Sequence, residues 1–255
     1  VSGADATESG SQSVTITIND NEATPTVTLT VSSTSIAENA GSSLTLTATS
    51  SIVSGSDITV TLSTSGTATE GTDYGSLSDI TISAGATTGT TTFTPTDDSM
   101  YETSTDETAT VAIDTVSGGS ATENGTQAVT ITINENESAP TVTLAASATS
   151  IAENAGSSIT ITASLSGTTS QDVTVSLSSS STATEGTDYG TVSDITISSG
   201  STSGTATFTP TDDSLYDATS NETAILSISG VSGGGATESG DQKVTITITD
   251  NESAP

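Results

Sequence analysis

Apolar and polar residues alternate with a period of two along most of this 255-residue chain. Residues 26–29 read Thr-Val-Thr-Leu and residues 129–133 read Val-Thr-Ile-Thr-Ile, so aliphatic side chains fall on one face and threonines on the other. Threonine suits the wet face because its branched Cβ fits a pleated surface while its hydroxyl stays in water. The alternation predicts strands at 26–31, 43–49, 57–63, 79–83, 90–94, 108–113 and 127–133.

Turn-forming segments separate the predicted strands, as in Ser54-Gly55-Ser56, and no segment keeps a helical periodicity over three turns. Aromatic residues make up only 2% of the chain, so its cores must be built from small aliphatic side chains. Seven strands in roughly 115 residues are typical of an immunoglobulin-like sandwich. The sequence therefore predicts an all-β protein of tandem immunoglobulin-like antiparallel β-sandwiches.

The sequence repeats itself 115 residues further on, without insertion or deletion. The segment 35–41 returns as 150–156, and the segment 67–74 returns as 182–189. We expect three regions: residues 1–24 as the C-terminal strand of a preceding repeat, and complete repeats at 25–139 and 140–254. A protein built from stacked repeats usually owes its function to length and linkage and not to one active site.

The leading segment 1–24 contains one strand pattern, Val14-Thr15-Ile16-Thr17-Ile18, and a lone strand is not stable in water. Two interpretations are open. In the first, the chain is a portion of a longer repetitive filament. In the second, this strand completes a domain of a neighbouring copy by donor-strand pairing. In both, the expected partners are neighbouring repeats or copies of the same chain.

The charge of the chain is one-sided. Thirty-one acidic residues face a single basic residue, Lys243, and no histidine, for a net charge of −30. This excludes nucleic acid as a partner and disfavours anionic membrane surfaces, because both need lysine and arginine. An acidic disordered tail is the alternative, but the regular alternation argues against it. No apolar run is long enough for membrane insertion, and the scarcity of protease-sensitive residues indicates an extracellular protein.

Most acids fall in loops that follow every second strand, and in an antiparallel sandwich these loops gather at one end. In the first repeat they include Glu38 after the first strand, Glu70 and Asp73 after the third, and Glu135 and Glu137 after the last. The loops of the opposite end contain mainly serine, glycine and alanine. Acids that converge repel one another strongly unless a cation lies among them.

The residue types at this end select the kind of cation. Carboxylates without histidine or cysteine are ligands for a hard cation, and Ca²⁺ accepts many oxygens in flexible geometry where Mg²⁺ keeps more water. The adjacent Asp97 and Asp98 can point to two neighbouring ions. The alternative is a solvated acidic rim that holds no ion.

Paired acids also occur in glycosidases. Here the chain has no aromatic platform for a sugar, and the same acids recur in each repeat, so we expect no enzymatic activity. Tyr74 and Tyr189 are expected to pack in the sandwiches, and Phe93 and Phe208 to lie in the cores.

Several short motifs occur together in each repeat. In the first repeat they are Ile36-Ala37-Glu38, residues 68–74 with the sequence ATEGTDY, Phe93-Thr94-Pro95, Asp97-Asp98, Glu107 and residues 131–137. The combination resembles the Calx-β family, named for the cytoplasmic calcium-sensing domains of sodium–calcium exchangers and widespread in bacterial surface proteins. Both complete repeats share the resemblance, which implies calcium binding and a location on the outside of a bacterial cell.

The resemblance also implies which residues bind calcium. The implied ligands are Glu38, Asp73, Asp97, Asp98, Glu102, Glu135 and Glu137 in the first repeat, and Glu153, Asp188, Asp212, Asp213, Asp217, Asp250 and Glu252 in the second. The last acidic triplet of the family is interrupted here by Asn136 and Asn251, which argues for weaker affinity or fewer ions. Glu107 and Glu222 stay open between a ligand role and the start of the sixth strand.

The function that we expect is structural: a repeat segment of a long extracellular fibre, stalk or adhesin that calcium makes rigid. Only Ser138-Ala139-Pro140 separates Glu137 from the next strand, so an ion at this end would fix the angle between two domains. Strand complementation is one route by which such a fibre could assemble. The alternatives are a calcium-sensing regulatory module, against which the near-identical repeats argue, and a receptor-binding adhesin domain.

Overall fold

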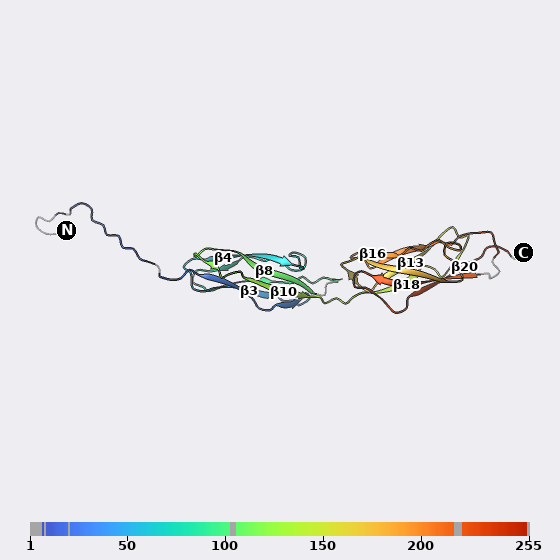
Figure 1. Ribbon diagram of the computed structural model, residues 1–255, viewed down its shortest axis with the longest axis horizontal. Coiled ribbons are helices and arrows are strands. Elements are labelled where there is room, and N and C mark those ends of the chain that lie inside the picture. The colour runs from blue at the N-terminus through green and yellow to red at the C-terminus, as the bar shows by residue number, and fades with distance from the viewer. Residues whose placement is uncertain (1–6, 8, 20, 103–105, 217–220, 254–255) are drawn as a thin grey trace.

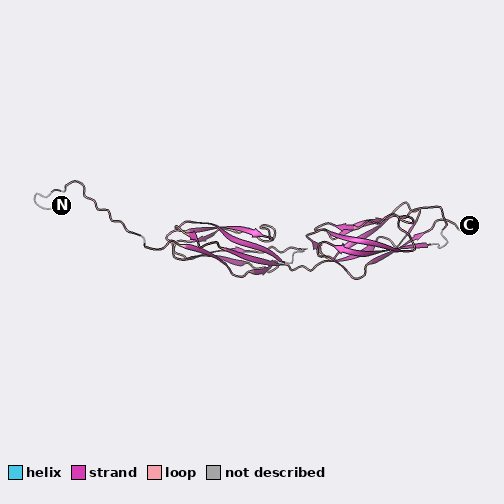
Figure 2. Ribbon diagram, in the orientation of Figure 1, coloured by secondary structure: helices cyan, strands magenta, loops and turns pink. Residues whose placement is uncertain are grey.

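The computed structural model describes residues 7, 9–19, 21–102, 106–216 and 221–253 of the chain. Two β-sandwiches lie end to end, and the described residues before Pro25 extend away from them (Figure 1). The described residues form strands, turns and irregular loops and contain no helix (Figure 2). The prediction of an all-β protein made of tandem immunoglobulin-like sandwiches is confirmed.

The first sandwich consists of two sheets that enclose one core. One sheet has the strand order β6 (Thr88–Phe93), β3 (Leu44–Ser50), β1 (Thr26–Val31) and β9 (Thr122–Glu123). The facing sheet has the order β2 (Ser35–Ala37), β10 (Ala128–Asn134), β8 (Asp106–Ser117), β4 (Ile58–Gly66) and β5 (Ile80–Ile82).

The second sandwich repeats this topology. One sheet has the order β17 (Ser203–Phe208), β13 (Ile159–Leu165), β11 (Thr141–Ala146) and β19 (Thr237–Glu238). The other has the order β12 (Ser150–Ala152), β20 (Lys243–Thr249), β18 (Asn221–Ser232), β15 (Val173–Ser181) and β16 (Ile195–Ile197).

The seven strands expected in the first repeat all form, as β1, β3, β4, β5, β6, β8 and β10, with ends that differ by a few residues. The sheets are largely antiparallel, as expected, and the exceptions are two short edge strands: β2 pairs with β10 and β9 pairs with β1 in parallel. These edge strands have three and two residues, too few to show an alternation.

The leading segment forms no strand in the residues that the structure describes there, 7, 9–19 and 21–24. Its apolar side chains are open to solvent: Val14 is 88% exposed, Ile16 82% and Ile18 91%. A strand pairs its backbone groups with a neighbouring strand, and no described strand of the chain pairs with this segment. That this segment is the last strand of another repeat stays a prediction.

Each core combines aliphatic residues with one aromatic pair near the acidic end of the sandwich. Tyr74 stacks on Phe93 and Tyr189 stacks on Phe208, each pair with ring centroids 4.6 Å apart, and all four side chains are buried. The expected packing role of these residues is confirmed. Because Tyr74 directly follows Asp73, this buried pair also fixes the loop that carries an acid.

A short parallel bridge joins the two sandwiches. In the loop after β6, β7 (Met100–Tyr101) pairs with β14 (Thr168–Thr169) of the second sandwich. The Thr168 hydroxyl donates to the Ser99 carbonyl at 2.8 Å, and the Ser170 N–H donates to the Tyr101 carbonyl at 3.1 Å. The acidic end of the first sandwich is therefore bonded directly to its successor.

Candidate metal centre

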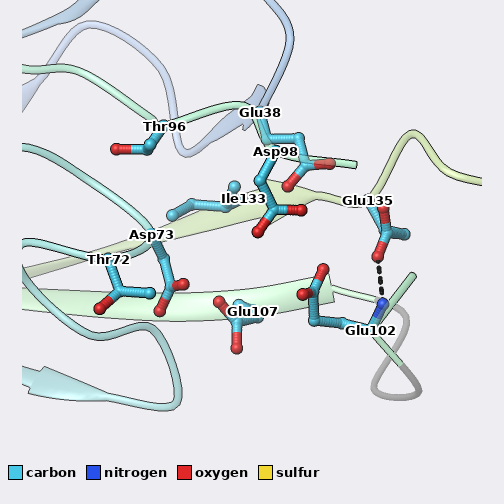
Figure 3. Close-up of a pocket in the computed structure, with 9 residues that line it drawn as sticks. All are labelled: Glu38, Thr72, Asp73, Thr96, Asp98, Glu102, Glu107, Ile133 and Glu135. Carbon is cyan, nitrogen blue, oxygen red and sulfur yellow. Dashed lines mark hydrogen bonds between the residues drawn. The ribbon is translucent and has the colours of Figure 1, made fainter. Parts of the chain in front are cut away.

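Acidic side chains from four segments meet at the end of the first sandwich that faces the second. They enclose a cavity of about 10 Å³, close to the space of one water-sized sphere. Its lining residues are Glu38, Thr72, Asp73, Thr96, Asp98, Glu102, Glu107, Ile133 and Glu135, and their carboxylates point toward one another (Figure 3). A space of this size has no room for an organic ligand.

The sheet edge positions Glu38. The parallel pairing of β2 with β10 places Ala37 beside Asn134, and the Glu38 N–H continues the ladder by donating to the Asn134 carbonyl at 3.1 Å. Glu38 therefore follows one edge strand while Glu135 follows its partner. Oxygens of Glu38, Glu135 and Glu137 all lie within 4.8 Å of one another.

A second pair of loops positions the aspartates. The Thr69 N–H donates to Asp73 Oδ2 at 2.5 Å, which closes the turn before Tyr74. The Thr96 N–H donates to the Asp73 carbonyl at 2.9 Å, which ties this turn to the segment carrying Asp97 and Asp98. Two loops distant in sequence are thereby held against each other at the cavity.

The adjacent aspartates line different spaces. Asp98 lines the small cavity, whereas Asp97 lines a neighbouring surface pocket of about 170 Å³. Glu38 lines both. The two adjacent aspartates therefore point to different spaces, and Glu38 borders both.

Backbone donors hold Glu135 in its charged form. The Glu102 N–H donates to Glu135 Oε2 at 2.7 Å, and the Glu137 N–H donates to Oε1 at 2.9 Å. Burial opposes ionisation, but these bonds outweigh it and lower the pKa of Glu135 to about 2. Glu135 therefore favours its charged form within the cluster.

The carboxylates around Glu135 are forced toward their protonated forms. Burial and then the neighbouring carboxylates of Glu137 and Glu135 raise the pKa of Glu38 to about 9. Burial, with the proximity of Glu135 and Asp98, raises the pKa of Glu102 to about 8. Burial and the charge of Asp73 raise the pKa of Glu107 to about 7. The raised pKa values favour protonation of these three carboxyls, and a cation that bound here would displace such protons.

The cluster also contains buried oxygens that no described donor reaches. Within the described residues, Glu38 Oε1 and Glu137 Oε2 are buried without a hydrogen-bond partner, and Glu252 Oε2 is in the same condition in the second sandwich. A buried carboxylate oxygen without a partner is costly, and coordination to a cation removes that cost. The residues present therefore fit a hard cation.

The second sandwich builds the same cavity. Its space, again about 10 Å³, is lined by Glu153, Asp188, Thr211, Asp213, Asn221, Glu222, Ile248 and Asp250. Glu153 is only 8% exposed and accepts the Asn251 N–H at 3.1 Å. A hydrogen-bonding contact with Glu153, followed by burial, raises the pKa of Glu252 to about 7. Asp212 lines an adjacent pocket that Glu153 shares.

The sequence model of the Calx-beta domain matches residues 20–137 and 135–252. Together these two matches cover nearly the whole chain. The chain belongs to the Calx-beta domain family. A search of curated proteins finds no match to it.

Solved structures with related architecture include Calx-beta and adhesin proteins, all distant. Calcium binding domain CBD12 of CALX1.1 is 13% identical, with 84% of this chain and 96% of that chain covered and a TM-score of 0.36. The adhesin InvE of Yersinia pseudotuberculosis is 14% identical, with 89% and 59% covered and a TM-score of 0.34. Invasin, described as a bacterial integrin-binding protein, is 17% identical, with 89% and 40% covered and a TM-score of 0.40.

The structure gathers most of the residues that the Calx-beta resemblance singles out. Those lining the two small cavities or the adjoining clusters are Glu38, Asp73, Asp97, Asp98, Glu102, Glu135, Glu137, Glu153, Asp188, Asp212, Asp213, Asp250 and Glu252. Asp217 lies outside the described residues. That these residues bind calcium stays a prediction.

Three residues show what sequence reasoning left open or missed. Glu107 and Glu222 each lie near the start of the sixth strand of their repeat and also line a cavity, so the two options do not exclude each other. Glu70, grouped with the acids of this end, turns away and accepts the Leu77 N–H at 3.1 Å. The alternation along β8 could have identified Glu107 as a residue of the site. It places Glu107 as the cross-strand partner of Ile133, which also lines the cavity.

The amide in the terminal triplet of this Calx-beta chain has a local partner. Asn136 is exposed, and its side-chain nitrogen donates to Glu137 Oε1 at 2.8 Å. Asn251 makes the equivalent bond to Glu252 Oε1 at 2.7 Å. The amides orient the adjacent glutamates and add no charge to the cluster.

Proposed function

We propose that each sandwich binds Ca²⁺ at its acidic end and that the bound ion stiffens the joint with the next domain. The buried, unpartnered oxygens of Glu38 and Glu137 carry this proposal. Glu38, Asp73, Asp98, Glu102, Glu107 and Glu135 would supply ligands around the small cavity, with Asp97 and Glu137 on its outer side. The ion would neutralise carboxylates that otherwise repel one another and hold protons.

The position of the cluster supports the proposed stiffening role. Asp98 Oδ1 accepts the Met100 N–H at 2.6 Å, so this acid also holds the loop that pairs with the second sandwich. Glu102 flanks the same bridge on its other side. An ion that fixes Asp98 and Glu102 would therefore fix Met100 and Tyr101 between them.

Calcium titration calorimetry tests the binding claim. We expect saturable binding to the chain accompanied by proton release, measured as a dependence of the heat on the ionisation enthalpy of the buffer. The Asp98→Asn and Asp213→Asn variants should each remove sites from one domain. Binding that neither variant weakens would contradict the assignment.

On this basis we propose a structural, non-catalytic role in an extracellular fibre, stalk or adhesin of a bacterial cell surface. No helix that could cross a membrane occurs in the described part of the chain. A calcium-sensing module is the weaker alternative, because two copies with nearly the same acid set suit repetition better than graded sensing. A receptor-binding role would need a surface specific to one domain.

Strand complementation is a further part of the proposal, supported by the exposed side chains of Val14, Ile16 and Ile18. Their counterparts Ile131 and Ile133 in β10 are buried in a core, so the same pattern is suited to filling a sandwich. An Ile16→Asp/Ile18→Asp chain should lose any concentration-dependent assembly seen by sedimentation while both sandwiches keep their melting temperature. Unchanged assembly would contradict complementation.

A further inference from the structure

The second sandwich carries a copy of the loop that makes the joint. Leu215 and Tyr216 occupy the positions of Met100 and Tyr101 in the repeat. We call each of these two-residue segments a docking pair. Met100 and Tyr101 are partly buried, whereas Leu215 is 68% exposed and Tyr216 is 40% exposed. The second docking pair therefore leaves exposed the apolar surface that is partly buried in the first docking pair.

The exposed docking pair is already held in the shape of the covered one. The Leu215 N–H donates to Asp213 Oδ1 at 2.7 Å, as the Met100 N–H donates to Asp98 Oδ1 at 2.6 Å. The turn that presents the pair therefore forms without a partner. Little ordering of this turn is needed for docking, which favours binding.

The surface that receives the first docking pair has three features. It offers a strand edge, β14, for the backbone of Met100–Tyr101. It has Gly200 beside Met100: a Cβ added to Gly200 would lie 3.9 Å from Cε of Met100. It has Gly235 under the ring of Tyr101, where an added Cβ would lie 2.6 Å from Cε1. Gly235 makes room for the ring of Tyr101, whereas Gly200 lies at ordinary contact distance from Met100.

The first sandwich has the equivalent surface at its opposite end, and no strand among the described residues pairs with it as β7 pairs with β14. Val53 and Ser54 stand at the positions of Thr168 and Thr169, and Val53 is 59% exposed. Residues 52–55 and Gly119 line a groove of about 250 Å³, together with Glu22, Ala23 and Pro25 from the segment that enters this sandwich. We call it the acceptor groove. The Gly85 N–H donates to the Ser54 carbonyl at 2.9 Å, as the Gly200 N–H donates to the Thr169 carbonyl at 3.0 Å.

We propose that Leu215–Tyr216 docks into the acceptor groove of another repeat domain of this type, so that domains join head to tail through a two-residue parallel bridge. The partner is identified by the joint inside this chain, where the equivalent pair occupies the equivalent surface. The inference goes beyond the calcium role, because the bridge consists of backbone hydrogen bonds, the Thr168 hydroxyl and two large side chains, and no carboxylate of the bridge itself is needed.

One sequence difference between the repeats affects how well a docked tyrosine fits the acceptor groove. Ser120 stands in the first sandwich where Gly235 stands in the second, and its φ of 56° is close to the 61° of Gly235. A Cβ at this position crowds the docked tyrosine, so the groove of the first sandwich should bind more weakly than one with glycine. Ser120→Gly should therefore strengthen docking.

Thiol cross-linking tests the proposal, because the chain has no cysteine of its own. A Leu215→Cys chain is mixed with a Val53→Cys chain at about 1 mM, where weak contacts between separate chains are populated. These positions correspond to the register partners Met100 and Thr168, so a Met100→Cys/Thr168→Cys chain is the positive control. A Thr92→Cys chain, exposed on β6 away from the groove, is the matched negative control.

The expected result is a Leu215→Cys/Val53→Cys heterodimer that forms about tenfold faster than the product with Thr92→Cys, a preference worth about 1.4 kcal/mol. Tyr216→Ala in the first chain should lower this rate to that of the control, and Ser120→Gly in the second should raise it. Equal rates with Val53→Cys and Thr92→Cys, with the positive control closing, would overturn the proposal. Both cross-linking rates are measured with calcium and with chelator. A failure of docking can then be distinguished from a failure of calcium binding.

Discussion

The two docking pairs have similar sequences and different structures. Met100–Tyr101 forms strand β7 against β14, whereas Leu215–Tyr216 forms no strand. The receiving surfaces differ in the same way, because Thr168–Thr169 is a strand and Val53–Ser54 is not. Where the partner is present, both segments become strands. Strand formation at these positions is thus a property of the joint between domains and not of the local sequence.

The acidic ends of the two sandwiches, unlike the docking pairs, resemble each other in structure. Both sandwiches have a small cavity lined by acids at equivalent positions, although only the first cavity adjoins a docked bridge within the described residues. The acid cluster is therefore a property of each repeat, and the bridge is a property of the pair. Variants at equivalent positions of the two repeats can separate the two effects.

The largest expected effect is the loss of calcium stabilisation. Calcium at 100- to 1,000-fold above its Kd would add about 3–4 kcal/mol to the free energy of unfolding of a domain. Asp98→Asn and Asp213→Asn should each remove most of this from one domain, measured by urea unfolding with calcium and with chelator. Only Asp98→Asn should also loosen the joint. If calcium leaves the wild-type unfolding curve unchanged, the metal assignment is wrong.

The next effect should come from Gly235→Ala. Its φ of 61° disfavours a side chain by about 1–2 kcal/mol, and the new Cβ would displace the ring of Tyr101. We expect a less stable second domain and an undocked bridge, detected as faster labelling of a cysteine at position 100. Ser120→Gly, at the equivalent site without a docked ring, should not lower stability. An unchanged labelling rate in Gly235→Ala would contradict the packing argument.

A smaller effect should appear as pH dependence in the absence of calcium. The pKa values of Glu38 and Glu102 are raised to about 9 and about 8 in the folded chain, above the ordinary value of 4.5. The folded state then binds more protons, so the free energy of unfolding falls as pH rises from 4.5 toward 9. The lowered pKa of Glu135 acts in the opposite direction, and only below pH 4.5.

In chelator we therefore expect the melting temperature to be about 5 °C lower at pH 8 than at pH 5, and calcium to remove this difference. The cluster is partly exposed to solvent, which limits the size of the effect. Glu38→Gln is the control for general repulsion among the acids. It removes the titrating carboxyl of Glu38 and leaves the charges of all other acids in place. A slope that Glu38→Gln leaves unchanged would exclude Glu38 as its source.

The smallest effect should separate Tyr101→Ala from Tyr216→Ala. The first removes a ring that packs on Gly235, and we expect a loss below about 1 kcal/mol in the stability of the second domain. The second removes a ring exposed to solvent and should leave the stability of the isolated chain within about 0.5 kcal/mol. Equal losses in the two variants would mean that the bridge contributes nothing.

Much of the fold could be predicted from the sequence because several of the longer strands alternate apolar and polar residues over five residues or more. Strands β1 and β10 are examples, with Val27 and Ile131 fully buried. The edge strands β2 and β9 could not be predicted, because two or three residues carry no period and their pairing depends on a neighbouring strand. The bridge between β7 and β14 is a still clearer case, since its partners belong to different repeats.

For the candidate site, the sequence predicted which acids gather and not how they differ. The spacing of acids after alternate strands placed Glu38, Asp98 and Glu135 at one end. It did not show that backbone N–H groups keep Glu135 charged while Glu38 is driven toward its protonated form. That difference depends on the direction of individual N–H bonds, which only the folded loops define.

The central claim is that calcium at the acidic end of one sandwich fixes its orientation to the next. Spin labels at Thr92→Cys and Thr207→Cys, equivalent exposed positions on β6 and β17, report this directly as an interdomain distance distribution. The account predicts one narrow distribution in calcium that broadens in chelator, and a broad distribution in both conditions for Asp98→Asn but not for Asp213→Asn. A wild-type distribution of the same width with and without calcium would contradict the claim.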